Sequence, residues 1–342
     1  MKSIRTRAGY SLRLDIRSTV VVTGLLAAAL TVSVVLIGTG DYPIGFADVI
    51  RTLLGNGSTG QEFVVNDLRL PRVLVALLVG SALGLGGAIF QSLSRNPLGS
   101  PDILGLGQGS TAGALVVIVL FGGTSLQVAG GALVGGLVTG LAIYVLAWKR
   151  GVHGYRLVLV GIGVCAMVTA VNGYLLTKAD LVDAARALVW MTGSLSGRGW
   201  DQVWPLCALC AVLVPLALGG GRALRMLEMG DDCAGALGIR VERTRMLLML
   251  AAVVLTAGAT AAAGPVGFVA LTAPQLAKRL TRAPGPNLGP ATVMGAALLV
   301  GADLTSQRVF GADQLPVGVL TGVLGGAYLI WLLVTERRTG RI

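Results

Sequence analysis

Long apolar segments constrain this chain more than any other feature of its sequence. They approach or exceed twenty residues and lie at 18–38, 73–93, 124–147, 157–177, 203–219, 246–263, 288–302 and 315–334. About twenty apolar residues span the core of a bilayer, and lipid offers no partner to open backbone groups, so such segments must be helices. Only 13% of the residues are charged, about half the share in a soluble chain. The sequence therefore predicts an all-α polytopic membrane protein, with residues 1–342 forming a single transmembrane domain.

We predict about ten transmembrane helices, near 18–38, 70–92, 103–121, 124–147, 157–177, 200–219, 244–263, 266–281, 288–306 and 314–335. An even number places both termini on one side. With the termini inside, 20 of the 27 Lys and Arg residues are cytoplasmic, and the inner segments carry net +13 against −2 outside. Cytoplasmic loops favour Lys and Arg, so we expect cytoplasmic termini in a cell membrane. The basic balance then needs no nucleic-acid partner.

Three arginines lie on the predicted outer side, where basic residues are scarce. Arg69 and Arg72 precede the second apolar segment, and Arg308 ends the ninth. A polar turn follows the second segment, and there we expect Asn96 and Asp102 to bond local backbone.

The longest internal cytoplasmic connection, residues 220–243, predicts two short helices. The first ends near Gly230, and the second spans 233–238, with Asp231 and Asp232 as its N-terminal caps and Gly238 as its stop. We expect a partly exposed apolar patch made of Leu224, Met226, Leu227, Met229, Ala234 and Leu237. Such a patch, rimmed by charge, marks a partner site, although an amphipathic turn lying on membrane lipid fits the pattern equally well.

Glycines recur every four residues in the last apolar segment, at Gly318, Gly322 and Gly326. Small residues at this spacing let helices approach closely. Packing within the chain is the default interpretation. The alternative is that this stripe faces a pore or a second subunit.

The sequence lacks the residue patterns that are typical of enzymes and of ion-driven carriers. No predicted span carries an acid, His or Lys near its middle, and Asp303 sits late in its segment, near the outer surface, so an ion-driven carrier is disfavoured. There is no G-x-x-x-x-G-K-[ST] phosphate loop, paired carboxylate set, Cys–His pair or metal cluster. We expect no catalytic residue, no metal and no cofactor on this chain. Active transport would then draw its energy from another polypeptide.

The sequence resembles the FecCD-type permeases of ATP-binding-cassette importers, which take up iron–siderophores, haem and vitamin B12. The resemblance covers about residues 20–336 and rests on "RLPRVLVALLVGSALGLGGAIFQSL", "NPLGSPDILG", "GDDCAGALGI", "AGPVGFVAL" and "QLPVGVLTGVLGGAYLIWLL". Within the family, "GAIFQSLSRNPLGSPD" and "VERTRMLLMLAAVVLTA" are most similar to the smaller permease subunits of ferric-enterobactin importers.

This resemblance implies a set of partners. They are a second, different permease chain (a homodimer stays open), two ATPase subunits that use the ATP, and an extracytoplasmic siderophore-binding protein. The cargo would be an iron(III)-siderophore, with vitamin B12, haem or another siderophore as the alternative.

The resemblance also implies roles for particular residues. Arg69, Arg72 and, with a one-residue gap, Arg308 would contact acidic residues of the binding protein. Residues 222–240, including Gly238, would form coupling helices in a cleft of the ATPase. The path would run between subunits along the fifth and tenth helices, which makes Gly318, Gly322 and Gly326 candidates for the path or the interface.

Overall fold

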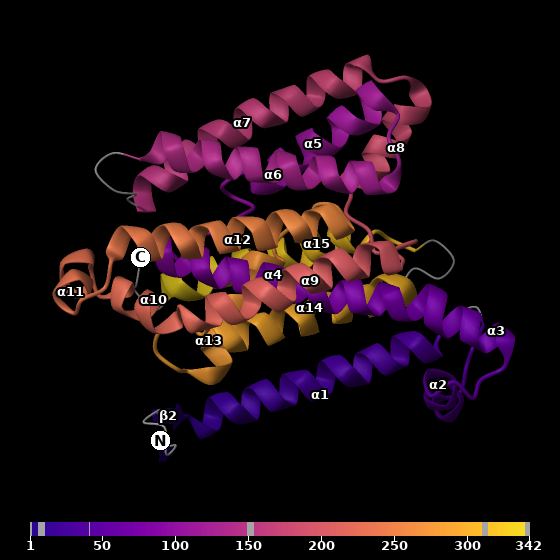
Figure 1. The fold of residues 1–342 in the computed structure, drawn as a ribbon, viewed down its shortest axis with the longest axis horizontal. Coiled ribbons are helices and arrows are strands. Elements are labelled where there is room, and N and C mark those ends of the chain that lie inside the picture. The colour runs from indigo at the N-terminus through magenta and orange to yellow at the C-terminus, as the bar shows by residue number, and fades with distance from the viewer. Residues whose placement is uncertain (1, 6–10, 41, 149–153, 310–313, 339–342) are drawn as a thin grey trace.

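The computed structural model shows a bundle of long helices (Figure 1) and describes residues 2–5, 11–40, 42–148, 154–309 and 314–338. Ten long helices form its body. They are α1 (Ile16–Gly38), α4 (Leu70–Ser94), α5 (Leu106–Phe121), α6 (Ser125–Ala147), α7 (Gly154–Lys178), α9 (Trp200–Gly219), α12 (Val241–Ala263), α13 (Val269–Thr281), α14 (Leu288–Arg308) and α15 (Val317–Arg338). Each lies within three residues of a predicted helix at both ends.

Shorter elements join these helices at the two ends of the bundle. They are α2 (Phe46–Leu53), α3 (Thr59–Glu62), the π-helix η1 (Phe63–Arg69), α8 (Leu181–Met191), α10 (Gly221–Glu228) and α11 (Asp231–Ala236). The strands β1 (Lys2–Arg5) and β2 (Ser11–Leu14) pair antiparallel. Outside this short hairpin the described elements are all helices, as predicted, and the alternation of polar and apolar residues in "SLRL" is the period-two pattern of a strand.

Seven helical segments of the described chain are long and apolar enough to cross a membrane, and α3, η1 and α4 count among them as one continuous helix. Leu106–Phe121 and Val317–Leu332 are shorter apolar helices. α5 has 16 residues. α13 has 13 residues, because "AGPVGF" interrupts the helical run before it. Gly264 and Phe268 take left-handed φ values of +76° and +66° at this break.

α4 occupies the centre of the bundle, and 16 of its 25 residues are buried. Pro71 suits its first turn, where no backbone N–H is needed. Gly80 and Gly84 bring α4 against the backbone of α14, because an added side chain at either position would collide with the carbonyls of Gly295 and Ala291. This close approach fixes the position of α4 relative to α14.

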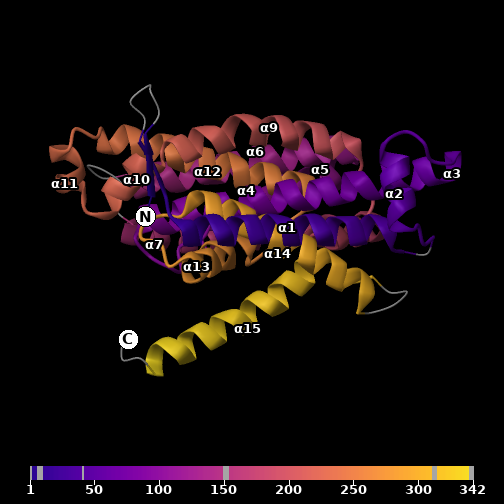
Figure 2. The same cartoon turned by 90° about the horizontal axis from the view of Figure 1, so that it is seen from below.

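The other helices flank this centre on two sides. Figure 1 shows α5, α6, α7 and α8 grouped on one side and α1 on the other. In Figure 2, α15 diverges from the bundle toward its C-terminal end. α10 and α11 lie at the same end of the bundle as β2, whereas α2 and α3 lie at the opposite end.

Candidate functional site

Arg69 and Arg72 lie together at the end of the bundle that carries α2 and α3. Arg69 ends η1, and its guanidinium donates from Nη1 to the carbonyl of Ile37 at 2.7 Å and from Nη2 to the carbonyl of Tyr42 at 2.8 Å. These bonds tie the start of α4 to the end of α1. Arg69 is therefore part of the scaffold of this end as well as partly exposed on it.

Arg72 forms a buried ion pair with Asp303 of α14. Its Nη2 lies 2.7 Å from Oδ1 and its Nε 3.1 Å from Oδ2 of that carboxylate. Gln307 donates to the same carboxylate at 2.8 Å, and Arg72 Nη1 donates to Gln314 at 3.3 Å. Asp303 is fully buried between helices, at the same end of the bundle as Arg69 and Arg72. The bidentate geometry compensates the carboxylate for its loss of water.

Arg308 is the last residue of α14 and lies on the surface at this same end of the bundle. Within the described part of the chain no ion pair of its guanidinium is found. The three predicted arginines thus share one end, but Arg72 and Arg69 each hold internal partners, and Arg308 extends outward.

At the opposite end, the predicted apolar patch of α10 and α11 divides into two faces. Leu224, Leu227 and Ala234 are buried against the bundle, so their predicted partial exposure is wrong. The three-residue spacing of the leucines places both on the inner side of α10. Met229 is 68% and Leu237 60% exposed on the outer side.

Two of the remaining residues of this connection, Met226 and Gly238, are less buried than the two inner leucines. Met226 is half-buried, and Gly238 is exposed with φ +81°. α11 begins at Asp231 rather than at 233, with Gly230 as its N-cap, and neither Asp231 nor Asp232 is that cap.

Asp231 instead accepts charged hydrogen bonds from two arginines, one on α12 and one directly after α4. Arg245 of α12 donates to both carboxylate oxygens at 2.9 Å, and Arg95 donates to Oδ1 at 2.7 Å. Burial raises the pKa of Asp231, but hydrogen bonds and charge from Arg245 and Arg95 outweigh it and hold the pKa below its ordinary value. Glu242 also binds Arg245, at 2.6 Å.

Sequence reasoning missed Arg95, which it counted only as an inner basic residue. Arg95 follows the last residue of α4 with a left-handed φ of +50° and donates to the carbonyl of Leu227 at 2.6 and 3.1 Å. A non-glycine residue with positive φ is uncommon. No sequence pattern here predicts that conformation for Arg95. Its partners on α10 and α11 lie more than 130 residues away, so only the fold reveals the cluster.

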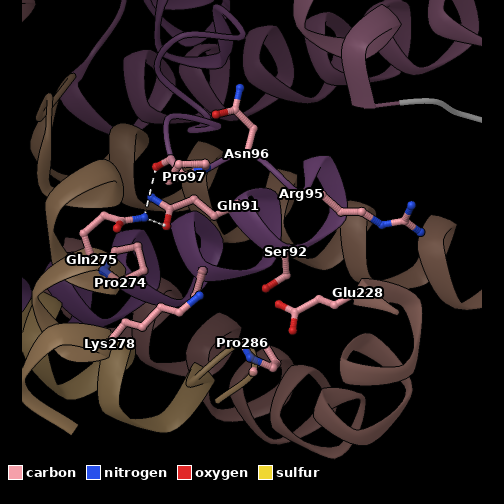
Figure 3. A pocket seen from close by; sticks show the side chains of 12 residues that line it. Gln91, Ser92, Arg95, Asn96, Pro97, Glu228, Pro274, Gln275, Lys278 and Pro286 are labelled. Atoms are coloured by element: carbon pink, nitrogen blue, oxygen red, sulfur yellow. Dashed lines mark hydrogen bonds between the residues drawn. The ribbon is translucent and has the colours of Figure 1, made fainter. Parts of the chain in front are cut away.

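A cavity of about 470 Å³ lies beside this cluster, between α4, α13 and α10 (Figure 3). Its wall is mostly polar. Gln275 donates to Gln91 at 2.6 Å and to the carbonyl of Pro97 at 3.1 Å. Figure 3 shows Glu228 and Lys278 pointing into the cavity from opposite walls. Among the described residues, no group of His, Cys, Asp and Glu is arranged to hold a metal ion.

The glycines of α15 serve two different surfaces. Gly318 packs inside the chain, because its N–H donates to the carbonyl of Gly193 at 3.0 Å and an added side chain would meet Thr192. An added side chain at Gly322 or Gly326 would meet no atom within 4 Å. The default interpretation therefore holds for Gly318, whereas Gly322 and Gly326 border open space.

The turn 95–105 after α4 folds back into the bundle. Asn96 accepts from the N–H of Leu98 at 2.9 Å, as predicted. The side chain of Asp102 does not bond local backbone as predicted; its Oδ2 accepts from the N–H of Phe268 at 3.2 Å, at the break before α13. Phe268 in turn packs on Gly325 of α15. The turn therefore connects α4 with α13 and α15.

Comparisons with known proteins agree with this arrangement. Residues 25–335 match the FecCD transport family. The chain is 47% identical to the ferric enterobactin transport system permease protein FepG of Escherichia coli K12, over 92% of this chain and 95% of that one. It is 36% identical to the iron(3+)-hydroxamate import system permease protein FhuG of Bacillus subtilis 168, over 86% and 90%. A solved metal-chelate type ABC transporter in an inward-facing conformation superposes with a TM-score of 0.80 at 25% identity, covering 93% of this chain and 99% of that one.

Proposed function

This chain belongs to the FecCD transport family, and from that premise we propose that it carries an iron(III)-siderophore of the enterobactin class from a binding protein into the cytoplasm. It is a multi-pass protein of the inner cell membrane, and its family consists of permease subunits that are not themselves enzymes. The observation that carries the proposal is the 47% identity to a ferric enterobactin permease over almost the whole chain. Vitamin B12, haem or another siderophore is the alternative cargo.

The end with α10 and α11 faces the cytoplasm in this proposal. β2 lies at that end in Figure 1, and α15 runs toward it in Figure 2. The positive-inside rule assigns the same side, because the segments at this end hold most of the Lys and Arg residues. About ten spans then leave both termini in the cytoplasm.

The outer arginines would orient the binding protein. Arg69, Arg72 and Arg308 form the proposed docking surface, and charge-assisted pairs with carboxylates of the partner would give orientation and fast association. Arg308 is the most accessible of the three. Arg72 already forms an ion pair with Asp303, so its guanidinium would both stabilise the fold and contact the binding protein.

The exposed inner residues would contact two ATPase subunits, which bind and hydrolyse the ATP. Met229 and Leu237 form the proposed contact, with Met226 and Gly238 beside them. Leu224, Leu227 and Ala234 take a different role, since they attach α10 and α11 to the bundle. Exposed apolar residues on the cytoplasmic face of a membrane protein are typical of such a contact.

A second permease subunit would cover the open face of α15. Gly322 and Gly326 border open space, and Val323 and Ile330 on the same helix are exposed. The path for the chelate would run between the two subunits along α7 and α15. A different permease chain is the proposed partner, with a homodimer as the alternative.

The test is uptake of radiolabelled iron in cells that lack this chain. Ferric enterobactin uptake should be lost in the deletion strain and restored by the wild-type chain. It should stop when cellular ATP is depleted and continue when an ionophore collapses the ion gradients. Restored uptake of vitamin B12 or haem without ferric siderophore would replace the cargo, and uptake that follows the ion gradient would refute the mechanism.

A further inference from the structure

α4 is the element that reaches both proposed surfaces. Its 25 residues span about 37 Å at 1.5 Å per residue. An arginine stands at each end, Arg72 in the first turn and Arg95 just after the last. Each arginine binds an aspartate from another part of the chain, Asp303 at the outer end and Asp231 at the inner end.

The inner ion pair belongs to a junction of four elements, α4, α10, α11 and α12. Asp231 begins α11 and binds Arg245 of α12 through both carboxylate oxygens and Arg95 of α4 through one. Arg95 also binds the carbonyl of Leu227 in α10. The side chain of Arg245 is only 8% exposed. A bidentate pair fixes orientation as well as distance, so α10 and α11 are held to α4 and α12 in one geometry.

On its other side, α10 is separated from α13 by the cavity of Figure 3. Glu228 of α10 and Lys278 of α13 point into this cavity from facing walls, and no ion pair between them is found among the described residues. α10 therefore has room to move relative to α13, but it is held by charged contacts to α4 and α12.

We propose that Asp231 is a positioning residue that joins the coupling helices α10 and α11 to α4 and α12, so that a displacement imposed on them passes to these two helices and not to α13. The proposal rests on the proposed function, because the displacement comes from the ATPase subunits. Apolar contacts of Leu224 and Leu227 hold α10 near the bundle, but such contacts are not directional. The ion pairs of Asp231 with Arg245 and Arg95 are directional, so they fix the orientation of α10 and α11 relative to α4 and α12.

The experiment uses the complete transporter, with both permease chains and both ATPase subunits, reconstituted in liposomes with the binding protein and ferric enterobactin. Asp231→Asn removes the charge and keeps the size. Asp232→Asn is the matched control, because this neighbouring exposed aspartate forms no ion pair with the described residues. The measured quantities are iron taken up per ATP hydrolysed and the amount of ATPase subunit that co-purifies.

We expect Asp231→Asn to retain its ATPase subunits and to lose about fivefold or more in iron taken up per ATP, as coupling between two sites does at this scale. Asp232→Asn should match the wild type. An unchanged ratio for Asp231→Asn overturns the proposal. Loss of the ATPase subunits also overturns it, because Asp231 would then act in docking.

Arg95→Gln gives a second, milder variant, since it leaves Asp231 paired with Arg245. The double variant with Asp231→Asn should lose less coupling than the two single losses multiplied together, because both changes break the same pair between Asp231 and Arg95. If the coupling losses of the two single variants multiply in the double variant, the two residues act independently and the proposal is overturned. The proposed function is tested separately by Met229→Asp with Leu237→Asp: if the ATPase subunits remain bound, the contact surface itself is wrong, whatever Asp231 does.

Discussion

At the scale of single residues, arginine serves different purposes at different positions in the bundle. Arg72 and Arg245 neutralise carboxylates within the bundle, whereas Arg308 extends from its surface. The sequence ranks Arg69, Arg72 and Arg308 alike as outer arginines. Burial distinguishes them, because a paired buried charge cannot be removed without leaving its partner uncompensated.

Replacement of Arg72 should therefore lower the stability of the protein, whereas replacement of Arg308 should slow its association with the binding protein. Arg72→Gln leaves the buried carboxylate of Asp303 without its cation, so we expect a loss of about 3 kcal/mol of stability, measured as a lower unfolding temperature in detergent. Arg72→Leu combined with Asp303→Leu should recover most of it. Arg308→Glu should leave the unfolding temperature unchanged and slow binding-protein association about tenfold at low salt. If Arg308→Glu binds at the wild-type rate, this arginine does not take part in docking.

Acid should weaken the inner junction through Asp231. Arg245 and Arg95 hold the pKa of this carboxyl below its ordinary value of 3.8, while Glu242 lies on the other side of Arg245. A lowered pKa contributes stability above the ordinary value, and that stability is lost as the pH falls through the lowered one. The difference in unfolding temperature between wild type and Asp231→Asn should therefore be constant above about pH 5 and shrink below about pH 4. A difference that persists unchanged at about pH 2.5 would contradict this reading.

At the scale of elements, the breaks between helices do more than connect them. The turn 95–105 and the break before α13 meet through the bond from the Phe268 N–H to Asp102, and Phe268 packs on Gly325. Sequence reasoning placed helix ends at both breaks and treated the first of them as a local turn. Their contact joins residues 166 positions apart, which no local pattern encodes.

Asp102 should accordingly matter for the position of α13. Asp102→Ala removes the acceptor of a backbone N–H at a strained left-handed residue, and we expect a loss of about 1–2 kcal/mol, read as a lower unfolding temperature. Asp102→Asn keeps an oxygen in the same place and should be close to wild type. Equal losses for the two variants would show that charge, and not this hydrogen bond, is what the site needs.

At the scale of the whole molecule, glycine packs the bundle internally and leaves one face of α15 open. The missing side chain of Gly80 lets α14 approach closely, and that of Gly318 lets the backbone at 192–193 approach. No described atom lies close to the side-chain positions of Gly322 and Gly326. Several helices leave apolar faces uncovered, as expected of a protein in lipid. α15 differs from them because it diverges from the bundle in Figure 2, and its open face is where the proposed second permease chain would pack.

Leucine substitutions distinguish these two classes of glycine. Gly80→Leu should prevent folding, because its side chain would collide with the backbone of α14. Gly322→Leu should give a folded chain that no longer co-purifies with its partner permease. Gly24→Leu on α1, where an added side chain also meets no atom within 4 Å, is the matched control and should fold and assemble. Normal assembly of Gly322→Leu would remove this face from the interface.

The sequence by itself determined the helices and the distribution of charge between the two ends. Apolar length fixes where a helix can lie in lipid, and that requirement is local, so each predicted helix has a counterpart in the described chain whose ends lie within three residues, and seven segments there are long and apolar enough to cross a membrane. Only the tertiary structure decided which face of each helix is used. It buried Leu224 and Leu227, paired Arg72 with Asp303, and made Asp231 a joint rather than a cap. The reason is physical: helix formation depends on neighbours in the chain, whereas burial and ion pairing depend on residues that only the packed bundle brings together.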